Sequence, residues 1–137
     1  MKRLTSSLNE LLERILLSKC FARFRYPFSM PEEVGQDIGL DVDNQITFDK
    51  FINILANPSF LPSKVQKYMS RSEADALFVH AFRSDLFQGK SLFYYYFKQG
   101  WVEFQMTYDE NDRLRRMVLQ NKQIAEDSIE IKLARKQ

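Results

Sequence analysis

Apolar residues in the first part of the chain recur every three or four positions, which is the spacing of one helix face. This stripe lies within residues 7–24 and consists of Leu8, Leu11, Leu12, Ile15 and Leu16. Ser7 and Glu10 have the spacing of a capping box, in which each side chain bonds the backbone N–H of the other residue. Pro27 disfavours helical geometry at the residue before it. The pattern therefore predicts an amphipathic helix that begins at Ser7 and ends near Arg25.

The next segment, residues 28–45, contains Pro, Gly and several acidic residues. It predicts a loop with at most one helical turn, around residues 32–36. Thr47 is a favourable N-cap for a short helix that Asn57 and Pro58 stop. The apolar stripe of this helix consists of Phe48, Phe51, Ile52 and Leu55. Another short helix is expected over residues 63–69.

A second capping-box spacing, formed by Ser70 and Glu73, predicts the start of a longer helix. Its broad apolar face consists of Ala74, Leu77, Phe78, Ala81, Phe82 and Leu86. A face of this width favours a helix that packs against the core. Gln88 and Gly89 end the pattern.

From Ser91 onward, the helical period gives way to alternation and to aromatic residues with high strand propensity. Residues 91–97 and 101–108 predict two strands joined by a hairpin, with Gly100 supplying a positive φ. In the second strand one face carries Val102, Phe104, Met106 and Tyr108, and the other carries Trp101, Glu103, Gln105 and Thr107. Residues 113–120 predict a third strand. Residues 128–133 fit either a fourth strand or a frayed helix.

Together these elements predict an α+β fold in a single domain spanning residues 1–137. The helical part, residues 1–88, holds about four helices. The sheet part, residues 90–135, holds a meander of three to four antiparallel strands. Because such a meander is marginally stable alone, we expect it to pack on the helix that carries Leu77 and Phe82.

The charge balance favours no particular partner. The chain has 20 basic and 18 acidic residues and a net charge of +2, which is far from the basic character of most duplex-binding proteins. The single cysteine, Cys20, cannot form an intramolecular disulfide and fits a reducing compartment. No segment reads as a signal peptide or a membrane span. The sequence therefore favours a cytoplasmic protein.

Neither a metal site nor a catalytic site is favoured. Asp37, Asp41 and Asp43 invite a calcium-loop interpretation, but the residues that follow Asp41 lack the glycine and the glutamate that such a loop needs. His80 is the only histidine, and a pair with Cys20 has no accompanying motif. We therefore expect no catalytic residue, no metal and no cofactor.

A helix-turn-helix over Ser63 to Phe82, followed by a hairpin as a wing, is the alternative from the nucleic-acid class. Lys64, Lys67 and Arg71 would supply its contacts to nucleic acid. Acidic residues at the start of the second helix argue against it, because they would face phosphates. A small apolar ligand is a further alternative, and it predicts a closed apolar pocket between sheet and helix.

The first strand of the predicted sheet is apolar on both faces. Tyr94, Tyr95 and Tyr96 occupy successive positions, so they divide between the two faces. Aromatic residues with a polar tip suit a partly wet interface. The sequence thus favours a non-enzymatic protein-interaction or adaptor module that forms a homo-oligomer through an aromatic sheet face. The expected contact residues are Tyr94, Tyr95, Tyr96, Trp101 and Gln105.

Overall fold

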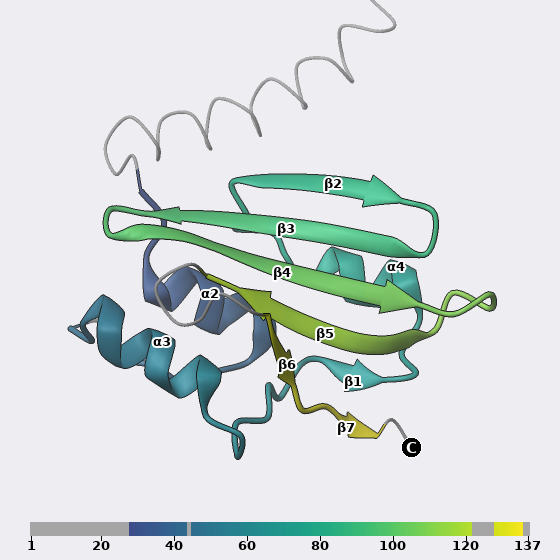
Figure 1. Ribbon diagram of the computed structural model, residues 1–137, viewed down its shortest axis with the longest axis horizontal. Coiled ribbons are helices and arrows are strands. Elements are labelled where there is room, and N and C mark those ends of the chain that lie inside the picture. The colour runs from purple at the N-terminus through teal and green to yellow at the C-terminus, as the bar shows by residue number, and fades with distance from the viewer. Residues whose placement is uncertain (1–27, 44, 122–127, 136–137) are drawn as a thin grey trace, which may run out of the picture.

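The computed structural model describes residues 28–43, 45–121 and 128–135 of the 137-residue chain. These ranges form an α+β fold built from three helices and seven strands (Figure 1). The helices are α2 (Pro31–Ile38), α3 (Phe48–Ala56) and α4 (Arg71–Ala76). The strands are β1 (Gln66–Lys67), β2 (Arg83–Phe87), β3 (Lys90–Phe97), β4 (Gly100–Tyr108), β5 (Leu114–Gln120), β6 (Ile129–Ile131) and β7 (Ala134–Arg135).

Five strands form an antiparallel sheet in the order β2-β3-β4-β5-β6, so neighbours in sequence are neighbours in the sheet. The antiparallel meander predicted from the alternating pattern is confirmed, with β2 as an additional strand. Short strands β1 and β7 pair in parallel beside it. Of the two alternatives for residues 128–133, the structure has the strand, which is β6.

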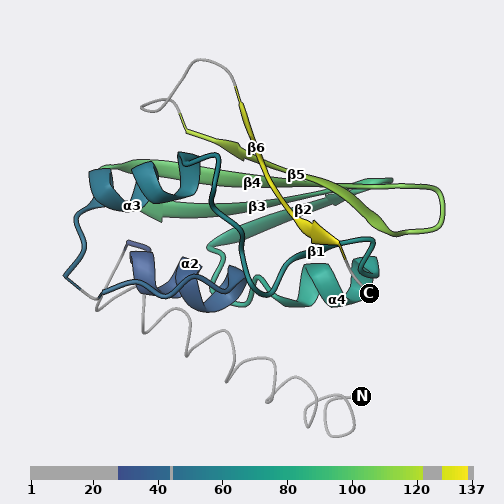
Figure 2. The same cartoon turned by 90° about the horizontal axis from the view of Figure 1, so that it is seen from below.

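One face of the five-stranded sheet holds the hydrophobic core and is called the inner face here. Figure 2 shows α2 and α4 on the same side of the sheet. Phe78 stacks on Phe93 of β3 with ring centroids 4.1 Å apart, and the rings of Phe48 and Phe51 from α3 meet Phe97. The buried inner-face residues of β3 and β4 are Ser91, Phe93, Tyr95, Phe97, Val102, Phe104, Met106 and Tyr108.

The helix α3 is confirmed with its predicted cap and stripe. The hydroxyl of Thr47 accepts the backbone N–H of Lys50 at 3.3 Å, and the four apolar residues of the stripe are buried. For residues 31–38, in contrast, the predicted loop is wrong, because α2 occupies them. Pro31 lies in its first turn, and Glu33 accepts the N–H of Met30 at 3.0 Å. Burial of two apolar residues on one side of α2 offsets its poor local helix propensity.

The helix predicted over residues 63–69 is wrong. This segment contains β1 and a left-handed residue, Tyr68, whose φ is +73°. The N–H of Tyr68 donates to the carbonyl of Leu114 at 2.7 Å, and the N–H of Leu114 donates to the carbonyl of Met69. Pairing with β5 thus supplies the backbone hydrogen bonds that a helix would otherwise provide.

The helix predicted after Ser70 begins as expected but ends after six residues. The Ser70 hydroxyl accepts the N–H of Glu73 at 3.3 Å and donates to its carboxylate at 2.9 Å. The chain then turns, and residues 83–87 form β2 rather than the end of a helix. The sheet is therefore covered at Phe93 by the turn residue Phe78, not by a helix carrying Leu77 and Phe82.

The predicted total of about four helices is not reached within the described ranges, where three are present. The helix expected from Ser7 onward, including Cys20, lies outside the described residues. The hairpin between β3 and β4 is tighter than expected, because Phe97 pairs with Gly100 and leaves a two-residue loop. None of the three helices in the described ranges has the length and apolar character that a membrane span requires.

Candidate interaction surface

The sheet face opposite the core carries a group of half-buried aromatic side chains. Alternation places Tyr94 and Tyr96 of β3 on it, and the strand register sets Trp101 opposite Tyr96 and Gln105 opposite Leu92. The rings of Tyr94 and Trp101 lie 6.3 Å apart, and Tyr96 meets the ring of Phe82 at 4.7 Å. We call Tyr94, Tyr96, Trp101 and Gln105 the outer aromatic face.

Four of the five residues expected in the interaction surface therefore share one face, and Tyr95 does not. Tyr95 points into the core, where its side chain has no exposed area. Its hydroxyl donates to Oδ2 of Asp37 on α2 at 2.6 Å. Its assignment to a contact surface is wrong, because the pleat that brings its neighbours outward turns Tyr95 inward.

The outer aromatic face surrounds a buried carboxyl group. Glu103 lies directly across from Tyr94 and is only 6% exposed. Burial raises the pKa of Glu103, since the charged carboxylate loses hydration. Burial and the nearby Glu103 charge together raise the pKa of Tyr94 to about 12. The centre of this face is therefore drier than its position on a sheet surface suggests.

Next to this face lies the edge strand β2, which the sequence analysis placed inside a helix. Leu86 and Phe87 point to opposite sides of the strand, yet they are 61% and 52% exposed. On the outer side Arg83 and Asp85 form an ion pair at 3.1 Å. The signal that could have identified β2 is Gln88-Gly89, since a two-residue turn containing Gly commonly joins two strands.

The three basic residues expected to contact nucleic acid do not form one surface. The ammonium group of Lys64 donates to the carbonyl of Gln36 at 2.6 Å. Arg71 points inward, where it donates to the carbonyls of Phe87 and Lys90 at 2.6 and 3.1 Å. Only Lys67 belongs to an exposed cluster. Residues 63–82 also contain a single short helix, so the helix-turn-helix interpretation of Ser63 to Phe82 is wrong.

The exposed cluster around Lys67 is built on Tyr68. Cationic groups of Lys67, Arg115 and Arg135 lie 5.5, 4.8 and 5.2 Å from the Tyr68 ring centroid. A hydrogen bond from Arg135, followed by the charge of Lys67, lowers the pKa of the Tyr68 hydroxyl. Asp109 accepts from Arg115 at 2.8 Å and balances part of this charge. The cluster joins β1, β5 and β7 through cation–π contacts.

The acidic residues considered for calcium are separated by the fold. Asp37 is 2% exposed within α2, whereas Asp41 and Asp43 are exposed in the following loop. The Asp37 carboxylate accepts the Tyr95 hydroxyl, and it also accepts the backbone N–H of His80 at 3.0 Å. Its other oxygen lies 2.7 Å from Nδ1 of His80. Within the described ranges no group of three metal-ligating side chains is present.

The Asp37–His80 contact resembles the pair that orients a catalytic histidine. Here the same carboxylate also holds Tyr95 of the sheet, so it fixes three chain segments in place. Cys20, the nucleophile considered for His80, lies outside the described residues. The geometry of the described residues therefore gives Asp37 a structural role.

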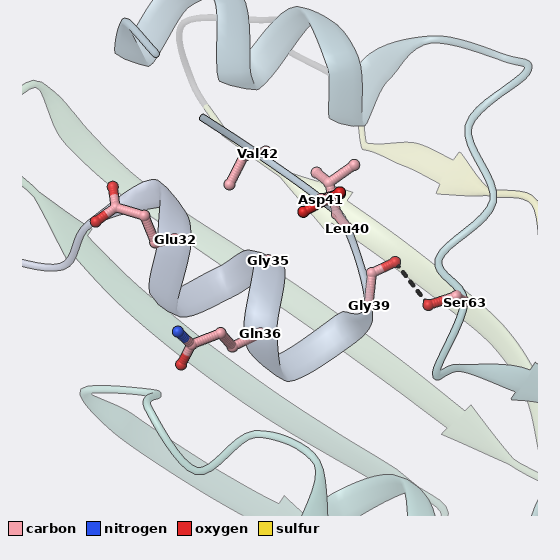
Figure 3. Close-up of a pocket in the computed structure, with 8 residues that line it drawn as sticks. All are labelled: Glu32, Gly35, Gln36, Gly39, Leu40, Asp41, Val42 and Ser63. Carbon is pink, nitrogen blue, oxygen red and sulfur yellow. Dashed lines mark hydrogen bonds between the residues drawn. The ribbon is translucent and has the colours of Figure 1, made fainter. Parts of the chain in front are cut away.

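A hollow of about 440 Å³ lies along α2 (Figure 3). It is lined by Glu32, Gly35, Gln36, Gly39, Leu40, Asp41, Val42 and Ser63. The Ser63 hydroxyl donates to the carbonyl of Gly39 at 3.1 Å across one end. Polar and charged side chains line much of this hollow, and it does not lie between the sheet and a helix. It differs from the closed apolar pocket expected for a small apolar ligand.

Comparison of the chain with known protein families, with curated proteins and with solved structures gives no match.

Proposed function

We propose that the protein is a non-enzymatic protein-interaction module that self-associates and uses the outer aromatic face as a contact surface. The observation that carries this proposal is the continuous group of half-buried aromatic rings at Tyr94, Tyr96 and Trp101. An antiparallel sheet with one face on the core commonly has a polar opposite face. Aromatic side chains with polar tips are enriched where proteins meet.

The electrostatics of this face also support the proposal. Glu103, which lies across from Tyr94, is buried and has a raised pKa, which lowers its charge in mildly acidic solution. The charges of Arg83 and Asp85 pair with each other on β2, at the edge of this face. Depletion of charge at the centre with polar groups around it is typical of an interface. Gln105 supplies a neutral hydrogen-bonding group beside it.

Trp101 is the only tryptophan of the chain, so its fluorescence reports on this face alone. We expect its emission to shift to shorter wavelength as concentration rises from micromolar to millimolar, since association removes water from the ring. Replacing Tyr94 by Ala should move the midpoint of this shift to at least about tenfold higher concentration. Tyr68→Ala is the matched control, because Tyr68 is a half-buried tyrosine away from this face.

Sedimentation equilibrium on the same samples provides the mass. The proposal fails if the emission of Trp101 is independent of concentration and the mass stays that of one chain throughout. It also fails if Tyr94→Ala and Tyr68→Ala shift the midpoint equally.

A further inference from the structure

The edge strand β2 has exposed residues on both of its faces and lies at one end of the five-stranded sheet. Within the part of the chain that the structure describes, β3 is the only strand that pairs with β2 in this sheet. Four of its five residues are exposed, including the apolar Leu86 and Phe87. Soluble proteins usually protect such an edge with proline, bulges or a covering segment, because its unpaired backbone groups can bind another strand.

The register shows which backbone groups of β2 face outward. The N–H of Tyr108 donates to the carbonyl of Gly89, so this pair extends the hydrogen-bonded pairs between β3 and β4. The odd-numbered residues of β3 therefore make their backbone hydrogen bonds to β4. The even-numbered residues of β3 then bond β2, at Arg83, Asp85 and Phe87. Ser84 and Leu86 therefore direct their N–H and C=O groups away from the sheet.

The sequence of β2 is complementary to itself in one antiparallel register. A two-fold axis at Ser84 sets Arg83 opposite Asp85 of the second copy, and the symmetry repeats this contact. Arg83 and Asp85 also form an ion pair within each strand. The four charged groups around the axis, two from each copy, therefore alternate in sign. An axis at Asp85 would instead place two carboxylates directly opposite each other, which is unfavourable.

We propose that β2 binds β2 of a second copy of this chain, antiparallel and with the two-fold axis at Ser84, so that the two sheets become continuous. This inference rests on the proposed function, because it names the partner and adds a second contact surface. Main-chain hydrogen bonds between the two copies of Ser84 provide the attraction, and the pairs of Arg83 with Asp85 select the register. In this arrangement the two outer aromatic faces lie side by side on one extended surface.

Charge exchange on the full chain tests the register. Arg83→Asp places four carboxylates around the axis, and Asp85→Arg places four guanidinium groups there. Each variant alone should weaken the dimer about tenfold or more, measured as the dissociation constant by sedimentation equilibrium. The double variant Arg83→Asp with Asp85→Arg should restore it. An equimolar mixture of the two single variants should form a heterodimer. Unchanged dissociation constants in both single variants would overturn the proposal.

Proline substitution tests the backbone contact. Ser84→Pro removes an N–H that faces outward, so it should abolish the dimer and leave thermal stability nearly unchanged. Asp85→Pro is the matched control, because it removes an N–H bonded to β3 and should destabilise the monomer. A dimer that persists in Ser84→Pro with unchanged affinity would contradict edge pairing.

Trp101 separates this inference from the proposed function. It lies on β4, two strands away from the β2 edge, so edge pairing should leave its emission unchanged. A mass that responds to the Arg83 and Ser84 variants without a change of emission supports the edge dimer. If emission and mass both depend on concentration but neither responds to those variants, the edge inference fails and the proposed function remains. A monomer at all concentrations, without an emission change, overturns both.

Discussion

Tyrosine side chains on the two faces of β3 differ in their burial and in their hydrogen-bond partners. Tyr95 is fully buried and donates its hydroxyl to Asp37, whereas Tyr94 and Tyr96 are half-buried on the outer aromatic face. What differs is a helix that brings a carboxylate to the inner face. A buried tyrosine needs a hydrogen-bond partner for its hydroxyl, because an unpaired polar group in the core costs about 1–3 kcal/mol. The position of Asp37 thus decides which tyrosine of the strand is structural.

The largest expected effect comes from removing the aromatic ring on each face. Tyr95→Ala should lower the free energy of unfolding by about 3–5 kcal/mol, because it leaves a cavity in the core and removes a donor from the buried carboxylate of Asp37. Tyr96→Ala should lower it by about 1 kcal/mol, since water can reach the vacated position. Urea unfolding monitored by circular dichroism measures both values. Equal losses for the two variants would remove the distinction between the faces.

An intermediate effect comes from removing only the hydroxyl. The inner face has a second pair of this kind, in which Tyr108 donates to Asp75 of α4 at 2.6 Å. Burial and the neighbouring Asp75 raise the pKa of the Tyr108 hydroxyl, so it remains a donor at physiological pH. Tyr95→Phe should cost about 1–3 kcal/mol of unfolding free energy.

Tyr108→Phe should cost less, because the Asp75 side chain is 20% exposed and water can replace the lost donor, whereas the Asp37 side chain is 1% exposed. The same urea titration gives both values. A larger loss for Tyr108→Phe would indicate that access of water to the carboxylate does not control the cost.

The smallest expected effect concerns Glu103 on the outer aromatic face. Its pKa in the folded protein lies above the ordinary value of 4.5, so the folded state binds the proton more tightly than the unfolded state. Its contribution to stability is therefore fully present below pH 4.5 and is lost as pH rises through the folded-state pKa. Glu103→Gln should flatten this part of the stability curve and raise stability at neutral pH.

Unfolding free energies of the wild type and of Glu103→Gln, measured from acidic to neutral pH, test this effect. A parallel pH dependence of the two proteins would show that another group dominates this range.

Local sequence patterns correctly predicted the elements for which the spacing of apolar residues fits only one type of secondary structure. Thr47 capped α3 as expected, and the alternation of β4 gave the correct inner and outer residues. The segment from Leu77 to Leu86 was wrongly predicted as a helix, because its apolar spacing fits a helix as well as it fits a turn followed by a strand. Stacking of Phe78 on Phe93 favours the turn, and that contact lies beyond any local pattern.

The candidate surface was predictable in part. Strand alternation alone identifies Tyr94, Tyr96, Trp101 and Gln105 as a common face once one face is assigned to the core. It does not say which face is covered. The Asp37–Tyr95 bond that settles the question joins residues 58 positions apart. The exposed edge at β2 escaped prediction because its residues were assigned to a helix.

Arg71 has a consequence for the edge strand that its sequence position does not suggest. Its guanidinium lies over the Tyr108 ring and bonds the Asp75 carboxylate, and it also bonds both carbonyls at the base of the β2–β3 turn. A free hairpin samples many conformations, and an incoming strand must select one of them at an entropic cost. By anchoring the turn to α4, Arg71 holds β2 ready in a single shape before any encounter.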